Sequence, residues 1–89
     1  MPTRDLPIVN KLGLHARAAS KFVTVASRYE SRITVVKDGR EVSGKSIMGV
    51  MMLAAARGSH ITVTAEGPDA EEALDGLADL VADRFGESQ

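Results

Sequence analysis

The stretch Gly13-Leu14-His15-Ala16-Arg17-Ala18-Ala19-Ser20 marks the point where a turn gives way to a helix. A helix that begins just after His15 leaves its first backbone N–H groups without intrahelical partners, beside the imidazole ring. Such N–H groups bind anions, and the helix dipole disfavours a positive charge on the ring. Arg17 adds a permanent cation suited to phosphate oxygens. The stretch therefore predicts a site at which His15 accepts a phosphoryl group and passes it on.

The composition indicates one small globular domain over residues 1–89, with 44% hydrophobic and 26% charged residues. The 11 basic residues balance 12 acidic ones, so no charge excess favours nucleic acid or a membrane surface as a partner. There are no cysteines, which excludes disulfides and thiolate metal sites, and no apolar run is long enough to cross a bilayer. We expect a cytoplasmic protein whose function lies on its surface, because so small a core leaves little room for a buried active site.

Hydrophobic periodicity and turn signals predict strands over 6–9, 32–37, 40–42 and 61–65, and helices over 16–28, 47–53 and 69–85. Asp38-Gly39 is a strong hairpin signal, and Ser46 is a typical N-cap residue. Residues 54–56 could extend the second helix toward Gly58. The order strand, helix, strand, strand, helix, strand, helix indicates an α+β fold in which helices cover one face of a sheet.

The last predicted helix continues its apolar stripe to Phe85 and ends at Gly86. The three residues that follow, beginning with Glu87, are expected to fray.

The residue patterns alone leave other functions open. One histidine and one arginine are a weak pattern, and a surface histidine beside a solvated arginine explains it more simply. The segment 39–46 fits the nucleotide-binding pattern G-x-x-x-x-G-K-[ST], but Asp38-Gly39 is better used as a hairpin turn, and a P-loop domain needs a larger parallel sheet. His15 and His60, without cysteine, are too few ligands for a metal site, so no metal or other cofactor is expected.

Two strings of this chain resemble a known family. Gly13-Leu14-His15-Ala16-Arg17-Ala18-Ala19 resembles the active-site signature of the HPr family, the histidine phosphocarriers of the bacterial phosphotransferase system. Lys45-Ser46-Ile47-Met48-Gly49-Val50-Met51-Met52-Leu53 resembles the regulatory serine segment of the same family. The spacing of the strings, the chain length and the element order also match. The resemblance implies an HPr-like open-faced sandwich, a four-stranded antiparallel sheet covered on one face by three helices (βαββαβα).

The resemblance also implies roles for the residues of the first string. Enzyme I, which draws its phosphate from phosphoenolpyruvate, would phosphorylate His15 on Nδ1, and His15 would pass the group to an enzyme IIA-type acceptor. Arg17 and the backbone N–H groups of Ala16, Arg17 and Ala18 would hold the phosphate. The protein would be a stoichiometric carrier rather than an independent enzyme. The usual signature has proline at the position of Ala18, where its ring would restrict the first turn of the helix.

The second string carries an implied regulatory site and a docking surface. A dedicated HPr kinase/phosphorylase would modify Ser46. Residues 47–53 are apolar on nearly every side, and a helix of two turns on a sheet cannot bury all of them. The resemblance points to Val50 and Leu53 as core residues and to a docking surface that consists of Ala16, Ser20, Ile47, Met48 and Met51.

A regulatory binding protein is the second hypothesis. In that case the helix after Ser46 would dock a transcription factor, a kinase or a sensor, and His15 would signal rather than feed sugar uptake. The two functions are compatible, whereas a small NTPase or metalloenzyme is a distant third. A monomer is the simplest expectation for either of the first two.

Overall fold

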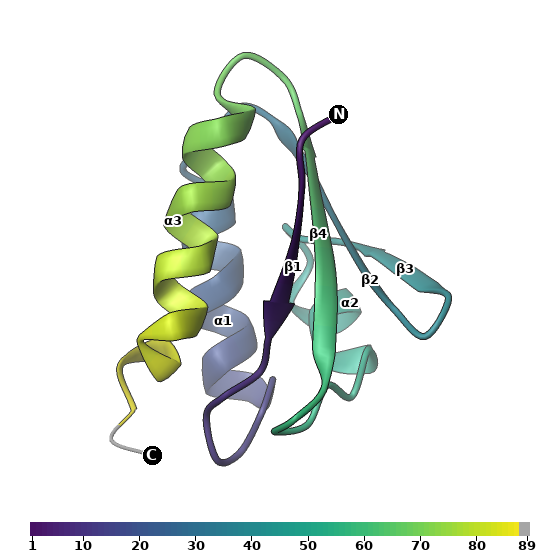
Figure 1. Cartoon of the computed structure of the whole chain (residues 1–89), viewed down its shortest axis with the longest axis vertical. Helices are drawn as coiled ribbons and strands as arrows, with labels where there is room; N and C mark the ends of the chain where they lie inside the picture. Colours follow the sequence, from purple (N-terminus) through teal and green to yellow (C-terminus); the bar gives the residue numbers. More distant parts are fainter. Residues whose placement is uncertain (88–89) are drawn as a thin grey trace.

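The computed structural model describes residues 1–87, which form one four-stranded antiparallel sheet with helices packed against it. The strand order across the sheet is β1-β4-β2-β3, and Figure 1 shows α1 and α3 side by side along one face of the sheet. The predicted fold class and element order are confirmed. The elements are β1 (Thr3–Pro7), α1 (Ala16–Ala26), β2 (Arg32–Lys37), β3 (Arg40–Ser43), α2 (Ile47–Met52), β4 (His60–Glu66), α3 (Ala70–Ala82) and a 3-10 turn, η1 (Arg84–Gly86).

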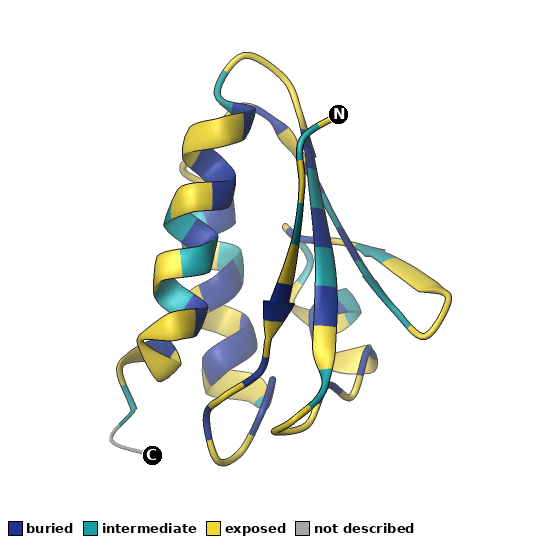
Figure 2. Cartoon of the chain, viewed as in Figure 1, coloured by how far each residue is buried: buried dark blue, intermediate teal, exposed yellow. Residues whose placement is uncertain are grey.

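The core lies between the sheet and the helices, and Figure 2 shows buried residues on the facing sides of both layers. In β4 the side chains alternate, so that Ile61, Val63 and Ala65 are buried while Thr62 and Thr64 are partly exposed on the other face. This alternation is what the sequence predicted for the strand. None of the helices within residues 1–87 is both long and apolar enough to span a bilayer.

The predicted hairpin is confirmed. β2 and β3 pair in a register that sets Lys37 opposite Arg40, leaving Asp38 and Gly39 as a two-residue turn with φ of 52° and 80°. Positive φ at both positions is what the right-handed strand twist favours in such a turn. Because residues 40–43 are a paired strand, the segment that fits the nucleotide-binding pattern does not form a phosphate loop.

The first strand differs from the prediction. It runs over Thr3–Pro7 rather than 6–9, and it pairs with β4 along its whole length. Only Leu6 of this strand is buried, since β1 is an edge strand whose pairing uses the backbone and leaves most of its side chains near solvent. Ile8 is buried beyond the strand and exchanges backbone hydrogen bonds with Gly58 and Ser59.

The second helix does not extend into residues 54–56, so that prediction is wrong. α2 ends at Met52, and Ala54 adopts a left-handed conformation with φ of 51°. The guanidinium of Arg40 donates a hydrogen bond to the Met52 carbonyl oxygen at 2.7 Å, which caps the helix from the β2–β3 hairpin. The first helix also ends slightly early, at Ala26.

The C-terminal prediction is wrong in two respects. α3 ends at Ala82 rather than continuing to Phe85, and Arg84 and Phe85 both adopt left-handed φ values, 55° and 57°. Phe85 therefore reaches the core from a turn rather than from a helical stripe. Glu87 does not fray: it contacts the N-terminal part of the chain, as described below. The last two residues of the predicted tail lie outside the described residues.

Candidate functional site

His15 occupies the N-cap position of α1. Its backbone is extended, with φ of −73° and ψ of 178°, and its carbonyl accepts the first intrahelical hydrogen bond, from Ala19 N–H at 2.8 Å. The N–H groups of Ala16, Arg17 and Ala18 precede that bond, so they are free to face an anion. The imidazole makes no capping bond, and 28% of its side chain is exposed. The ring thus stands beside a helix start whose N–H groups could bind an anion, and it is within reach of solvent.

The other side of the ring meets the C-terminal end of the chain. Nε2 of His15 lies 2.5 Å from Oε2 of Glu87, and Asn10 donates from Nδ2 to the second carboxylate oxygen, Oε1, at 3.0 Å. These two hydrogen bonds, that from Asn10 first, hold the pKa of the Glu87 carboxyl below its ordinary value. The carboxylate of Glu87 is therefore ionised at neutral pH and acts only as an acceptor.

The loop that carries His15 is braced by its own residues and by a neighbouring loop. Asn10 is fully buried and donates from Nδ2 to the Gly13 carbonyl at 2.8 Å, while Gly13 adopts a left-handed φ of 65°. Leu14 is buried, and its N–H donates to the Ala55 carbonyl at 2.9 Å. The backbone that leads into His15 is thus held in place before any ligand arrives.

Arg17 and two neighbours from the predicted docking surface, Ala16 and Ser20, are exposed on α1. Arg17 forms no ion pair within residues 1–87. Its guanidinium therefore has no carboxylate to leave before it can bind a phosphate. Ala18 is completely buried, so its side chain does not reach the surface beside His15.

The second string forms the short helix α2, and Ser46 is its N-cap residue, as predicted. The Ser46 hydroxyl accepts a hydrogen bond from the Gly49 N–H at 3.0 Å. The predicted division of side chains is also confirmed: Val50 and Leu53 are buried, whereas the exposed members are Ile47, Met48 and Met51, to which the structure adds Met52. We call these four exposed side chains the α2 patch; α2 itself packs against α1.

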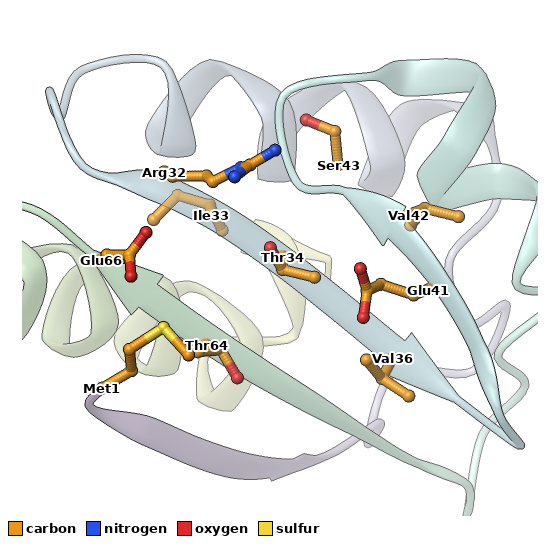
Figure 3. Close-up of a pocket in the computed structure, with 10 residues that line it drawn as sticks. All are labelled: Met1, Arg32, Ile33, Thr34, Val36, Glu41, Val42, Ser43, Thr64 and Glu66. Atoms are coloured by element: carbon orange, nitrogen blue, oxygen red, sulfur yellow. The ribbon is translucent and has the colours of Figure 1, made fainter.

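A concavity lies on the sheet face away from α1 and α3, remote from His15 (Figure 3). Its lining mixes the guanidinium of Arg32 with the carboxylates of Glu41 and Glu66 and with hydroxyl groups, those of Thr34, Ser43 and Thr64. This mixture favours no ligand class. Elsewhere, Nδ1 of His60 lies 3.4 Å from Oδ2 of Asp5, and both side chains are largely exposed. No group of three potential metal ligands comes together within residues 1–87. The arrangement around His15 is therefore the strongest candidate site in the described part of the chain.

Comparison with known proteins agrees with this geometry. The family model for the phosphorylation site of the PTS HPr component matches residues 2–83. The chain belongs to the HPr family. It is 52% identical to the phosphocarrier protein HPr of Cupriavidus necator over 89 residues, which are the whole of both chains.

Solved HPr structures show the same fold. The crystal structure of HPr-C-His from Thermoanaerobacter tengcongensis has a TM-score of 0.96 and 46% identity, with all of both chains covered. The structure of an HPr dimer from the same organism has a TM-score of 0.79 and 47% identity, covering 98% of this chain and 100% of that one. Membership of the HPr family makes the chain a phosphocarrier of the phosphotransferase system and implies contact with the enzymes of that system.

Sequence reasoning missed two residues of this HPr site, Asn10 and Glu87. Asn10 reads as an ordinary turn residue, and Glu87 follows Gly86 in a polar tail. The available signal was weak: a buried asparagine cannot be told from an exposed one by its neighbours in sequence. Glu87 lies 72 residues from His15, and only the tertiary fold brings the two together.

Proposed function

We propose that this HPr-family chain carries a phosphoryl group on His15, received from enzyme I with phosphoenolpyruvate as the source and passed to an enzyme IIA-type acceptor. One observation carries the proposal: the partly exposed His15 ring stands at the start of α1, beside N–H groups that precede the first intrahelical bond. An anion-binding helix start and a nucleophilic ring are the two things that a reversible phosphoryl carrier needs.

The chemical step is a displacement at phosphorus. The lone pair of His15 Nδ1 attacks the phosphorus atom of the donor, and an N–P bond forms. The bond between phosphorus and the donor atom breaks, and its electron pair stays on the donor. Transfer to the acceptor reverses the same step with a different partner. Positioning and charge stabilisation are most of what such a transfer needs from the protein.

Phosphate binding is assigned to the start of α1. The N–H groups of Ala16, Arg17 and Ala18 would donate to the phosphoryl oxygens, and the free guanidinium of Arg17 would supply positive charge. Alanine at position 18 supports three donors here, since proline at that position would have none to give.

The α2 patch is proposed as the docking surface, together with Ala16 and Ser20. Exposed methionines suit a surface that fits two different enzymes in turn, because their side chains are flexible and polarisable. Ser46 is proposed as the target of an HPr kinase/phosphorylase. A phosphate there would add charge next to Ile47 and Met48 without removing the cap that starts α2.

The carrier hypothesis has three further parts. The protein takes one phosphoryl group per cycle and has no turnover by itself. It acts as a monomer, because two enzymes must reach the same small site in turn. It works in the cytoplasm, where phosphoenolpyruvate is produced.

The test is a transfer assay with phosphoenolpyruvate, enzyme I and the full chain. We expect one acid-labile, base-stable phosphate per molecule. His15→Ala should take up none, and His60→Ala, which removes the other histidine, should label as the unmodified chain does. An unlabelled wild-type chain, or equal labelling of His15→Ala, would refute the proposal.

A further inference from the structure

We propose that Glu87 is a positioning residue that keeps the proton of the neutral His15 ring on Nε2 and so leaves Nδ1 as the nucleophilic nitrogen. The inference rests on the proposed function for its consequence, which is transfer at Nδ1, but not for the proton position itself. The observation behind it is the 2.5 Å approach of the Glu87 carboxylate to Nε2.

The tautomer follows from the nature of the two groups. A neutral imidazole carries one N–H and one lone pair, whereas a carboxylate can only accept hydrogen bonds. A carboxylate oxygen in contact with Nε2 therefore requires the proton on Nε2, because the other tautomer would set a nitrogen lone pair against an oxygen lone pair. The remaining nitrogen, Nδ1, then carries the free lone pair.

Asn10 fixes the carboxylate in this orientation. Its Nδ2 group bridges Glu87 Oε1 at 3.0 Å and the Gly13 carbonyl at 2.8 Å, so the Glu87 carboxylate is tied to the loop that carries His15. Asn10 is fully buried, and its Oδ1 atom has no hydrogen-bond partner within the described residues. A buried acceptor without a partner is unfavourable, so the two donor contacts of Nδ2 must offset this cost where they hold Asn10 in place.

The backbone that carries Glu87 is held just as firmly. Phe85 is buried, its carbonyl accepts a hydrogen bond from Lys21 Nζ at 2.6 Å, and Glu87 N–H donates to the Arg84 carbonyl at 2.9 Å. Lys21 lies in the second turn of α1, and His15 is the N-cap residue of the same helix. The C-terminal segment from Phe85 to Glu87 is therefore joined to α1 at two points. The left-handed φ values of Arg84 and Phe85 are unfavourable, and they persist only where surrounding contacts impose them.

The position of the Glu87 carboxylate also suits the phosphorylated form of His15. When the Nδ1 lone pair forms the N–P bond, the proton stays on Nε2 and the ring becomes positively charged. The Glu87 carboxylate, which hydrogen bonds keep ionised, then lies beside that charge. When the phosphoryl group leaves, the N–P electron pair returns to Nδ1 and the ring is again neutral with its proton on Nε2. No proton has to move in either direction.

The first measurement uses the unphosphorylated full chain, labelled with ¹⁵N, at about pH 8.5, above the ordinary pKa range of imidazole. We expect a slowly exchanging Nε2–H signal from His15 in the wild type and in Glu87→Gln, which keeps an acceptor oxygen. Glu87→Ala should lose the slow exchange. Glu41→Ala, which removes an exposed carboxylate on β3, should keep it.

The second measurement is the rate of transfer from phosphorylated enzyme I. Partners that orient a metal-ligating histidine through its other nitrogen are commonly worth tenfold or more. By analogy, we expect kcat/KM to fall roughly tenfold in Glu87→Ala and to recover largely in Glu87→Gln. A wild-type ring without a protected Nε2–H, or Glu87→Ala with unchanged exchange and unchanged kcat/KM, would overturn the inference. A wild type that shows the signal but takes no phosphate would refute the proposed function and leave the proton assignment in place.

Discussion

Gly13 approaches the backbone of Ala55 so closely that no side chain fits between them. A Cβ atom added to Gly13 would overlap the Ala55 carbonyl oxygen, the same oxygen that accepts the Leu14 N–H. The loop before His15 is therefore seated directly on the loop that follows α2. The first string is thus joined by backbone contact to the loop just beyond the second string, not by long side chains.

The first prediction concerns Gly13→Ala. The change combines a left-handed φ of 65° with the overlap at Ala55, so we expect about 3 kcal/mol of lost stability and slower phosphoryl transfer. Gly39→Ala is the matched control, since Gly39 also has positive φ, 80°, but a Cβ there would meet nothing within 4 Å. It should cost only about 1 kcal/mol. Equal losses in urea unfolding would show that the contact with Ala55 is not what matters.

The second prediction concerns pH. The carboxylate of Asp69 accepts hydrogen bonds from the Ser31 hydroxyl and from the backbone N–H groups of Glu30 and Ser31, which lower its pKa, the Ser31 hydroxyl most of all. A lowered pKa means that this contribution to stability is complete above the ordinary pKa of aspartate and is lost as pH falls through the lowered one. Asp69→Asn should therefore unfold at lower urea concentration than wild type at pH 7.

The same comparison of wild type and Asp69→Asn at acidic pH completes that test. As the carboxyl protonates, the wild type should lose its advantage, and the two urea midpoints should converge. Asp79→Asn, an exposed position on α3, is the control and should change little at either pH. A difference between wild type and Asp69→Asn that stays constant from pH 7 into the acid range would contradict the assignment.

The third prediction separates the two consequences of changing Ser46. Ser46→Ala removes the hydroxyl that accepts the Gly49 N–H, and we expect a loss of about 1 kcal/mol in unfolding free energy. Ser46→Asp keeps an acceptor at the N-cap, so its stability should stay near that of the wild type. Its negative charge stands next to the α2 patch, and affinity for enzyme I should fall about tenfold. Binding as tight as wild type in calorimetry would argue against a charge-sensitive docking surface.

The fourth prediction concerns Arg17. Arg17→Glu places a carboxylate where phosphoryl oxygens would bind, and we expect transfer to slow about a hundredfold in both directions with no change in thermal unfolding. Arg28→Glu makes the same charge change on an exposed residue just beyond the far end of α1. It should leave the transfer rates unchanged. Equal rates for wild type and Arg17→Glu in rapid-quench measurements would remove Arg17 from the mechanism.

The fold was largely predictable because its strongest signals are local. Alternation in β4, the Asp38-Gly39 turn and the N-cap at Ser46 depend on neighbouring residues only, and all three are present in the structure. The failures occurred where distant contacts decide the outcome. Residues 54–56 look helical in sequence, but a carbonyl at the end of α2 is capped by Arg40 from the hairpin. β1 is defined by its pairing with β4, which its polar side chains do not reveal.

The features of the site also divide into those set by neighbouring residues and those set by distant contacts. The helix start at His15 could be predicted from the residues around it, whereas the exposure of Ile47, Met48 and Met51 followed from the family resemblance. The contact with Glu87 could not be predicted. Helical periodicity predicted that α3 continues through Phe85, but in the structure the buried Phe85 lies in a left-handed turn instead. A one-dimensional pattern has no means of showing where the residue after that turn will lie.

The contact between His15 and Glu87 also has a consequence for the order of events during synthesis. Asn10 and His15 are made first, yet the carboxylate that completes their arrangement is the eighty-seventh residue. A nascent chain still lacks this contact when its first helix has already emerged, and a fragment that stops within α3 lacks it permanently. The hydrogen bond at Nε2 of His15 therefore forms only after the segment beyond α3 has been made and has folded back onto the start of α1.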